Sequence, residues 1–149
     1  MSEFSYKVNH RLRKIYWFIF RPKTTGVKCI IQNQDKILMI KRTLPNSKWV
    51  FPGGAIKRGE IFEKAIRREI SEDLGITLIN LKNIGNFVIK VHHRSESIYC
   101  FSAETQEESK RDETKLSEIK WFEADKLPNP LTPISQKVFD LYKKSIIKI

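Results

Sequence analysis

Three carboxylates are crowded near the end of a predicted helix, within residues 67–76, which read RREISEDLGI. Glu69, Glu72 and Asp73 stand at positions i, i+3 and i+4, a spacing that places them on one face of a helix. The C-terminal end of a helix carries partial negative charge, so acids are unfavourable there. A chain with a formal net charge of +11 therefore puts acids where they repel one another, which points to a requirement other than stability.

The helical pattern that carries these acids extends over residues 60–74, with Gly59 as its expected cap and Gly75 just past its C-terminus. At about 100° per residue, the three acids fall on the same arc as the apolar residues of this helix. That arc is formed by Phe62, Ala65 and Ile66. We therefore expect the acids to continue the side of the helix that faces the core.

Partly buried like charges cost free energy unless another group neutralises them. A divalent cation removes this cost, and a set of ligands made only of oxygen favours Mg²⁺, with Mn²⁺ as a substitute. The absence of His and Cys from the cluster argues against zinc. The alternative is an acidic helix end that faces solvent and binds no metal.

The wider segment from Gly54 to Ile76 reads GAIKRGEIFEKAIRREISEDLGI. This segment resembles the signature of the Nudix hydrolases at every fixed position except one, where Asp73 stands in place of the usual second Glu. So many fixed positions make the match specific, unlike a lone glycine pattern. The flanking stretches KWVFPGG and EIKWFEADKLP also look like those of the family.

The resemblance implies a role for each matching residue. The implied metal ligands are Glu69, Glu72, Asp73 and the backbone carbonyl of Gly53, and the implied catalytic residues are Arg68, Glu69 and Glu72. Glu69 would also assist a water molecule, while Arg68 would orient Glu69 and pair with Glu60. Gly54 would support the site as the first glycine of the signature.

The resemblance also implies an activity. Members of this family hydrolyse a diphosphate bond in a nucleoside diphosphate linked to another group, with metal ions as cofactors. In some relatives a Glu on a loop beyond the signature acts as an extra base or metal ligand, and here Glu104, Glu107 and Glu108 are the candidates. These three are otherwise ordinary solvated acids. The alternative function is a nucleotide- or RNA-binding module of the same fold with reduced or no catalysis.

Four residues outside the signature are candidates for substrate binding. Lys41 and Arg42 end a predicted strand near the glycine loop, where they are either phosphate ligands or a plain charged strand end. Trp49 either stacks on a base or packs in the core. His92 either contacts the substrate or is an ordinary residue at the end of a strand.

The elements that must position these residues form a mixed α/β pattern. Strand patterns are expected at residues 24–32, 36–42, 47–54, 85–91, 97–103 and 117–122, and a closing helix at 133–147. The segment 47–54 is expected to run into a loop at its glycines. The resemblance implies a Nudix-type α/β/α sandwich with a mixed sheet, spanning residues 23–149.

The remaining segment, residues 1–22, is predicted to be an N-terminal helical extension, because apolar residues recur at helical spacing over 4–19. We expect this amphipathic helix to dock onto the domain or onto a second subunit. A helix on a membrane surface is the alternative.

Composition sets further limits. A chain of 149 residues is expected to form a single domain. Its two cysteines, Cys29 and Cys100, lie in separate apolar segments and are expected to be buried free thiols in a reducing compartment. We find no signal peptide and no segment long enough for stable membrane insertion, so we predict a cytoplasmic protein. Its expected oligomeric state is a monomer or a homodimer. The basic charge favours a small nucleotide substrate, with the 5′ end of RNA as a second candidate partner.

Overall fold

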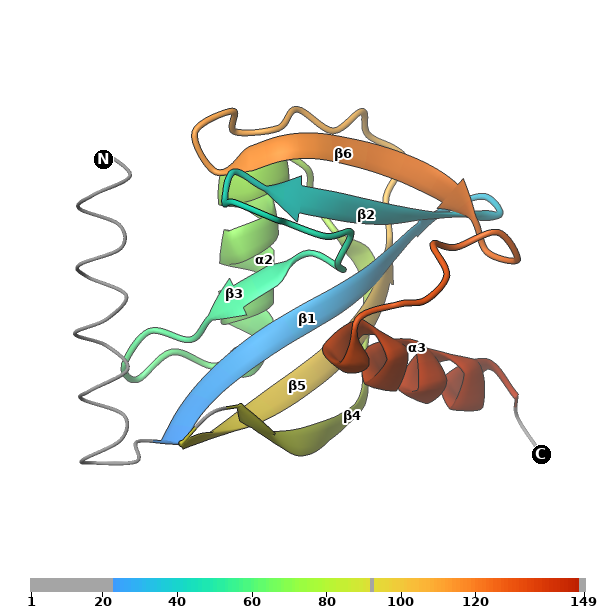
Figure 1. Cartoon of the computed structure of the whole chain (residues 1–149). Coiled ribbons are helices and arrows are strands. Elements are labelled where there is room, and N and C mark those ends of the chain that lie inside the picture. Colours follow the sequence, from blue (N-terminus) through green and yellow to red (C-terminus); the bar gives the residue numbers. More distant parts are fainter. Residues whose placement is uncertain (1–22, 92, 148–149) are drawn as a thin grey trace.

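The computed structural model describes residues 23–91 and 93–147. The expected N-terminal helix and His92 lie outside these residues. The elements are β1 (Lys23–Asn33), β2 (Lys36–Arg42), β3 (Gly53–Ala55), α2 (Phe62–Leu74), β4 (Ile79–Val91), β5 (Arg94–Glu104), β6 (Leu116–Glu123) and α3 (Pro133–Ile146) (Figure 1). The α/β class and the mixed order of strands and helices predicted from the sequence are confirmed.

Six strands form one mixed sheet in the order β4–β5–β1–β2–β6, with β3 paired to β1 outside this path. Strands β1 and β5 are parallel, whereas the other pairs are antiparallel. At one end β1 pairs with β2, where Gln32 is opposite Ile37. At the other end β1 pairs with β3, where Lys28 is opposite Gly53. Strands β1 and β2 therefore diverge, and β3 lies beside β1 where they separate (Figure 1).

The glycine segment differs from our expectation. The strand predicted at 47–54 was expected to give way to a loop at its glycines, but the glycines themselves form β3. The residues before them are joined to β2 only by an isolated bridge between Ile40 and Val50. Close approach explains the difference, because a Cβ placed on Gly53 would overlap the backbone carbonyl of Val27 in β1. Only glycine allows this pairing.

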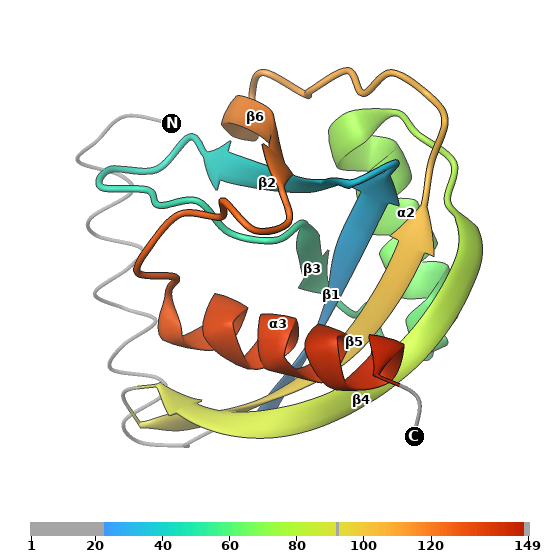
Figure 2. The same ribbon diagram turned by 90° about the vertical axis from the view of Figure 1, so that its right-hand side faces the viewer.

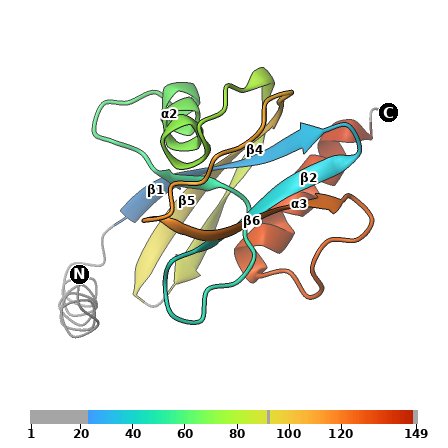
Figure 3. The ribbon, with the colours of Figure 1, turned by 90° about the horizontal axis from the view of Figure 1, so that it is seen from above.

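The two described helices cover opposite faces of the sheet (Figures 2 and 3). Successive residues of β1 alternate between these faces. Val27, Cys29 and Ile31 pack in the core cluster that includes the buried residues of α2. Ile30 packs in the second cluster, which includes the buried residues of α3. The domain thus has the three layers expected for an α/β/α sandwich.

Helix α2 begins at Phe62, after the expected start at Glu60. Ile61 occupies the N-cap position without a side-chain capping bond, so Gly59 is not the cap. Glu60 therefore lies in the turn before the helix, and its side chain extends toward Arg68 in α2. The helix ends as predicted at Gly75, whose φ of 65° is in the left-handed region that glycine adopts readily.

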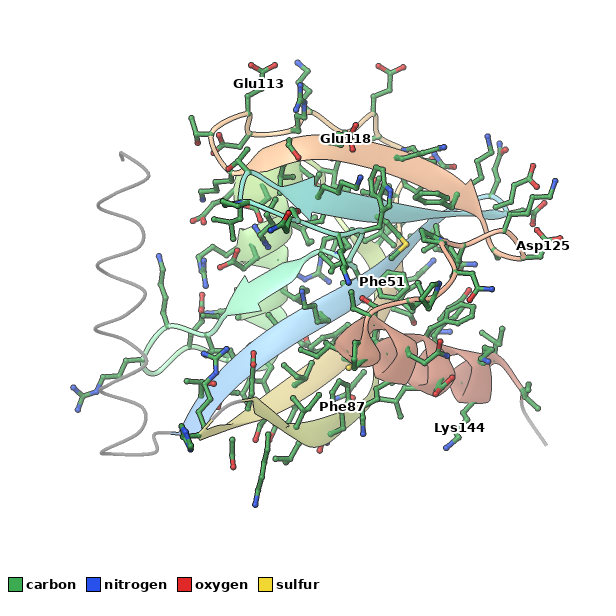
Figure 4. The ribbon with its side chains drawn as sticks, viewed as in Figure 1. Phe51, Phe87, Glu113, Glu118, Asp125 and Lys144 are labelled. Carbon is green, nitrogen blue, oxygen red and sulfur yellow. The ribbon has the colours of Figure 1, made fainter. Side chains whose placement is uncertain are left out.

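Helix α3 packs against the other face. Its N-terminus is capped by Thr132, whose hydroxyl accepts a hydrogen bond from a backbone N–H of the first turn. Val138 and Tyr142 are buried on the side of α3 that packs against the sheet. Figure 4 shows Phe51 and Phe87 where the sheet meets α3, and Phe51 is fully buried.

Cys29 and Cys100 are both buried free thiols, which confirms the prediction from their apolar surroundings. Burial raises the pKa of both thiols, to about 12 for Cys100. Neither cysteine is therefore a reactive thiolate at neutral pH. Among the described helices, none combines the length and the apolar character needed to cross a membrane.

Candidate active site

A cavity of about 480 Å³ is enclosed by β3, the adjoining parts of β1 and β5, and residues from α2. On its α2 side lie Gly53, Gly54, Glu69, Asp73, Arg42 and Lys115. On its β5 side lie Thr24, Gly26, Lys28, Arg94, Glu96 and Ile98. The cavity therefore brings acids of the signature together with cations from distant parts of the chain.

Glu69 reaches this cavity because Gly54 leaves room for it. The Glu69 side chain is 16% exposed, and a Cβ placed on Gly54 would overlap its carboxylate. The adjacent Arg68 donates a hydrogen bond from Nη1 to Glu69 Oε1 over 3.0 Å. Glycine on one side and arginine on the other thus fix the position of this carboxylate.

Arg68 is itself held by Glu60 in a two-point pair. Its Nε donates to Glu60 Oε2 over 2.7 Å, and its Nη2 donates to Oε1 over 2.9 Å. Nη2 also donates to the carbonyl of Ala55 over 3.1 Å. The hydrogen bond from Arg68 is the main cause that lowers the pKa of Glu60 to about 2, and the same bond raises the pKa of Arg68. The expected contacts of Arg68 with Glu60 and Glu69 are both present.

Asp73 is the most buried of the three acids, with a side chain only 1% exposed. Two cations from distant parts of the chain face it. Arg42 Nη1 lies 3.4 Å from Oδ2, and Lys115 Nζ lies 3.5 Å from Oδ1. Within the described chain, Oδ1 has no hydrogen-bond partner. A buried carboxylate oxygen without a hydrogen bond is costly and is most often found where a ligand or ion binds.

Arg42 also contacts the carbonyl of Gly53, to which its Nη2 donates a hydrogen bond over 2.6 Å. This carbonyl is the one that the resemblance assigns to the metal. The guanidinium of Arg42 thus joins two of the expected metal ligands, Gly53 and Asp73. This guanidinium therefore bridges the carbonyl oxygen of Gly53 and Oδ2 of Asp73.

Glu72 departs from the expectation that all three acids face the core. Its side chain is 44% exposed and does not line the cavity. From Glu69, three steps of the helix turn about −60° and four steps about +40°. Glu72 and Asp73 therefore lie on opposite sides of Glu69, and Glu72 is turned toward Arg68 at 3.4 Å and Lys115 at 3.9 Å. Over residues 23–91 and 93–147, no three Asp, Glu, His or Cys side chains already converge on a common metal position.

Lys28 and Lys115 line the cavity but were not anticipated from the sequence. Lys28 interrupts the apolar run from Val27 to Ile31 in β1, and this interruption was a signal that could have been used. Its Nζ donates a hydrogen bond to the carbonyl of Phe51 over 3.1 Å. Burial, followed by the positive charge of Arg42, lowers the pKa of Lys28 to about 8. Lys115 lies on a loop, and a loop has no periodicity from which an inward-facing residue could be predicted.

The structure brings one of the four candidate substrate-binding residues, Arg42, to the cavity. Lys41 instead pairs with Glu118 at 3.4 Å and lies over the ring of Trp49. Trp49 packs edge-on against Phe122, with ring centroids 5.2 Å apart, and does not line the cavity. The fourth candidate, His92, is outside the described residues.

The three candidate acids between β5 and β6 do not line the cavity either, and Glu104 is the last residue of β5 and not part of the loop. Glu104 accepts a hydrogen bond from the side chain of Asn80, and Glu107 accepts one from the backbone N–H of Thr77. Glu108 is exposed. Figure 4 shows Glu113, at the tip of the same loop, pointing away from the sheet. The loop therefore supplies a cation, Lys115, where an acid was expected.

Comparison with known proteins agrees with this geometry. The model of the NUDIX domain family matches residues 22–142. The chain is 30% identical over 122 residues to the Nudix hydrolase YvcI of Bacillus subtilis, covering 78% of this chain and 77% of that protein. It is also 30% identical over 113 residues to the oxidized purine nucleoside triphosphate hydrolase of Danio rerio, covering 74% and 72%.

The fold is shared with solved structures as well. The crystal structure of a MutT NUDIX hydrolase from Burkholderia pseudomallei superimposes with a TM-score of 0.73 at 25% identity, covering 80% of this chain and 98% of that one. The family match includes the whole signature segment, from Gly54 to Ile76. The chain is therefore a Nudix hydrolase, a member of a family of enzymes that act on phosphoanhydride bonds.

Proposed function

We propose that this Nudix hydrolase cleaves a diphosphate bond in a nucleoside diphosphate linked to another group, and that it requires divalent metal ions. The observation that carries the proposal is the buried Oδ1 of Asp73, which accepts no hydrogen bond from the described residues. It lies in the same cavity as Glu69. The only charged neighbour that the described chain offers Oδ1 is Lys115 at 3.5 Å, and two acids in one cavity favour a divalent cation as a further partner.

The residues present suit Mg²⁺ in kind, with Mn²⁺ as a substitute. Glu69, Asp73 and the carbonyl of Gly53 offer only oxygen atoms, which hard cations prefer. Because Mg²⁺ keeps several of its waters, a few protein ligands are enough. The exposed side chain of Glu72 would have to rotate toward Glu69 to add a third carboxylate. Arg42 would have to release the carbonyl of Gly53.

Glu69 is the proposed base. When bound, divalent metal ions neutralise phosphoryl oxygens and lower the pKa of a water molecule. Arg68 occupies Oε1 of Glu69, which leaves Oε2 to take the proton from the water that attacks phosphorus. A positioned base adds roughly 10²–10⁴-fold to the rate. Arg68 keeps this carboxylate oriented, because Glu60 and the carbonyl of Ala55 hold its own guanidinium.

The cations of the cavity are the proposed ligands of the substrate phosphates. Arg42, Lys115 and Lys28 all line it. A planar guanidinium donates to two phosphoryl oxygens at once, whereas an ammonium acts as a point charge. Arg42 would exchange its contacts with Asp73 and Gly53 for phosphate oxygens, so that the same group balances charge before and after substrate binds.

The relative from Danio rerio is named as a hydrolase of oxidized purine nucleoside triphosphates. This name supports nucleoside triphosphates as the first substrates to test. The decisive assay incubates the protein with a nucleotide panel and Mg²⁺ or Mn²⁺ and detects new phosphate monoesters. We expect turnover of at least one nucleotide and loss of turnover in Glu69→Gln and Glu72→Gln. Glu63→Gln is the matched control, because Glu63 is an exposed acid in the first turn of the same helix.

Metal binding is tested separately from activity. Isothermal titration with Mn²⁺ should give weaker binding for Asp73→Asn than for wild type and no change for Glu63→Gln. If the wild type hydrolyses none of the nucleotides in the panel, the proposed reaction is contradicted. Equal Mn²⁺ affinity in wild type and Asp73→Asn would contradict the proposed ligand.

A further inference from the structure

The ammonium of Lys115 contacts two acids of the signature at once. Its Nζ lies 3.5 Å from Asp73 Oδ1 and 3.9 Å from Glu72 Oε2. Arg42 faces only Asp73, and Arg68 faces Glu72 but not Asp73. Within residues 23–91 and 93–147, Lys115 is therefore the cation that these two neighbouring acids share.

Hydrogen bonds fix the backbone on both sides of Lys115. Its N–H donates to the carbonyl of Asp112 over 3.0 Å, and its carbonyl accepts from the N–H of Thr43 over 3.0 Å. Asp112 in turn donates its N–H to the carbonyl of Asp73 over 2.9 Å. The loop before β6 is thus fastened to the end of α2 and to the residue after β2. The side chain of Lys115 starts from a fixed point beside the acids.

The burial of Asp73 distinguishes this contact from an ordinary surface ion pair. Exposed ion pairs contribute little because water solvates both partners, and the side chains of Lys115 and Glu72 are 45% and 44% exposed. The side chain of Asp73 is only 1% exposed, and its Oδ1 has no hydrogen-bond partner in the described chain. Because solvent barely reaches this oxygen, the nearby ammonium balances its charge.

Asp73 is also the residue at which the chain departs from the signature, where Glu is usual. Its two carboxylate oxygens face Lys115 at 3.5 Å and Arg42 at 3.4 Å. Glu is longer by one methylene, or about 1.5 Å, and would fill the space between the carboxylate and these two cations. The shorter acid and the lysine therefore fit each other.

The charges of the site suit a single divalent ion. Four signature acids take part: Glu60, Glu69, Glu72 and Asp73. Arg68 brings one positive charge to the first two, and Lys115 brings one to the last two. Two negative charges remain, and one divalent ion balances them once Arg42 turns to the substrate phosphates. Without Lys115 three negative charges would remain, and a second divalent ion would be favoured.

We propose that Lys115 is the permanent counter-ion of Glu72 and Asp73, and that it takes the place of a second divalent ion, so that the site binds one ion per chain. The inference rests on the proposed function, which requires a divalent ion held by Glu69 and Asp73. It adds the number of ions and the residue that sets this number. An ammonium has three N–H donors, so one donor of Lys115 stays available to a phosphoryl oxygen.

Equilibrium dialysis against Mn²⁺ counts the bound ions without turnover, because no nucleotide is present. The wild type should saturate at one Mn²⁺ per chain, whereas Lys115→Met should take up a second ion. Lys115→Arg keeps the charge and should saturate at one. Lys110→Met is the matched control and should also bind one, because Lys110 is an exposed lysine of the same loop and forms no ion pair with a signature acid in the described chain.

A double variant locates the second ion. Adding Glu72→Gln to Lys115→Met removes the acid that the lysine has released, so uptake should return to one Mn²⁺ per chain. Melting curves in a chelating buffer verify that each variant is folded. If Lys115→Met does not fold, Lys115→Gln removes the same charge and keeps a polar side chain at this partly exposed position.

The outcomes separate the inference from the proposed function. If the wild type hydrolyses nucleotides but binds two or more Mn²⁺ per chain, the role of Lys115 is overturned and the proposed reaction remains. The same conclusion follows if Lys115→Met binds only one ion, or if Lys115→Arg also takes up a second. If the wild type binds no Mn²⁺, the metal requirement of the proposed function fails, and this inference fails with it.

Discussion

Two acids one helical turn apart, Glu69 and Asp73, are held in opposite ways. Glu69 is fixed by its neighbour Arg68, which Glu60 in turn anchors from just before the same helix. Asp73 is fixed by Arg42 and Lys115, which come from β2 and from the loop before β6. The first arrangement lies within one short segment of the chain. The second joins three segments that only the fold brings together.

This difference in support fits the different tasks that we propose for the two acids. Glu69 is partly exposed and has one oxygen left for chemistry, so its support must be rigid while its carboxylate stays accessible. Asp73 is almost fully buried, so its charge must always be balanced by a cation. Arg42 and Lys115 supply this balance, and under the proposed function a metal ion would share it.

The largest effect is expected from Gly54→Ala, which attacks the support of Glu69. The new methyl group would overlap the Glu69 carboxylate and push it away from the cavity. We expect kcat to fall by at least about 100-fold, as for loss of a positioned base. The melting temperature should change little, because the displaced group is the end of a side chain. Steady-state kinetics with a melting curve measures both, and near-normal kcat would show that Glu69 need not occupy this position.

The support of Asp73 is tested by Arg42→Met. This change removes a cation from a buried carboxylate, which costs about 1–3 kcal/mol of unfolding free energy in the absence of metal. Urea denaturation in a chelating buffer measures the loss. Lys41→Met is the matched control, because Lys41 belongs to an exposed pair that contributes little. Adding Mn²⁺ should stabilise Arg42→Met more than wild type, and an equal gain in both would argue against metal replacing Arg42.

A smaller effect of opposite sign is expected from Lys28→Met. The pKa of Lys28 falls from 10.5 to about 8 in the folded protein, so the unfolded state holds this proton more tightly. Stability should therefore rise with pH from about 8 to 10.5, and below this window the charged ammonium costs free energy. Lys28→Met should raise the melting temperature at pH 7, by less than the pKa shift alone implies, because the variant leaves the Phe51 carbonyl without its donor. Thermal melts should show this gain disappearing near pH 10.5.

The smallest effect concerns Glu60, which is partly exposed to solvent. Its folded pKa of about 2 lies below the ordinary value of 4.5, so its contribution is complete above pH 4.5 and is lost as pH falls through 2. The difference in melting temperature between wild type and Glu60→Gln should be constant from pH 7 to 5 and should shrink below pH 4.5. If the difference in melting temperature does not change with pH, the contact between Glu60 and Arg68 stabilises the protein through packing and not through charge.

Much of the fold and part of the site could be predicted from the sequence. The positions of β1 and β2, the end of α2 just before Gly75 and the position of α3 follow from periodicity and turn chemistry, which are local. The contacts of Arg68 with Glu60 and Glu69 are local as well. The glycine strand β3 was not foreseen, because its pairing depends on how closely β1 approaches Gly53.

The rest of the site could not be read from local patterns. Helical spacing grouped Glu72 with Glu69 and Asp73. Glu72 and Asp73 lie on opposite sides of Glu69 around the helix, and only the packing of α2 against the sheet decides that the Asp73 side is buried. Similarly, Glu104, Glu107 and Glu108 were candidates for the site, whereas the residue that lines the cavity from the loop before β6 is Lys115. A loop carries no periodicity that would reveal which of its residues turns inward.

The sequence by itself determined the family and the class of the fold, because the signature and the order of strand and helix patterns are local features. The tertiary structure decided which cations meet those acids and which residues form the opposite wall of the cavity. The physical reason is that charge balance and shape in a cavity depend on strands and loops far apart in the chain, and their meeting is set by the packing of the whole sheet.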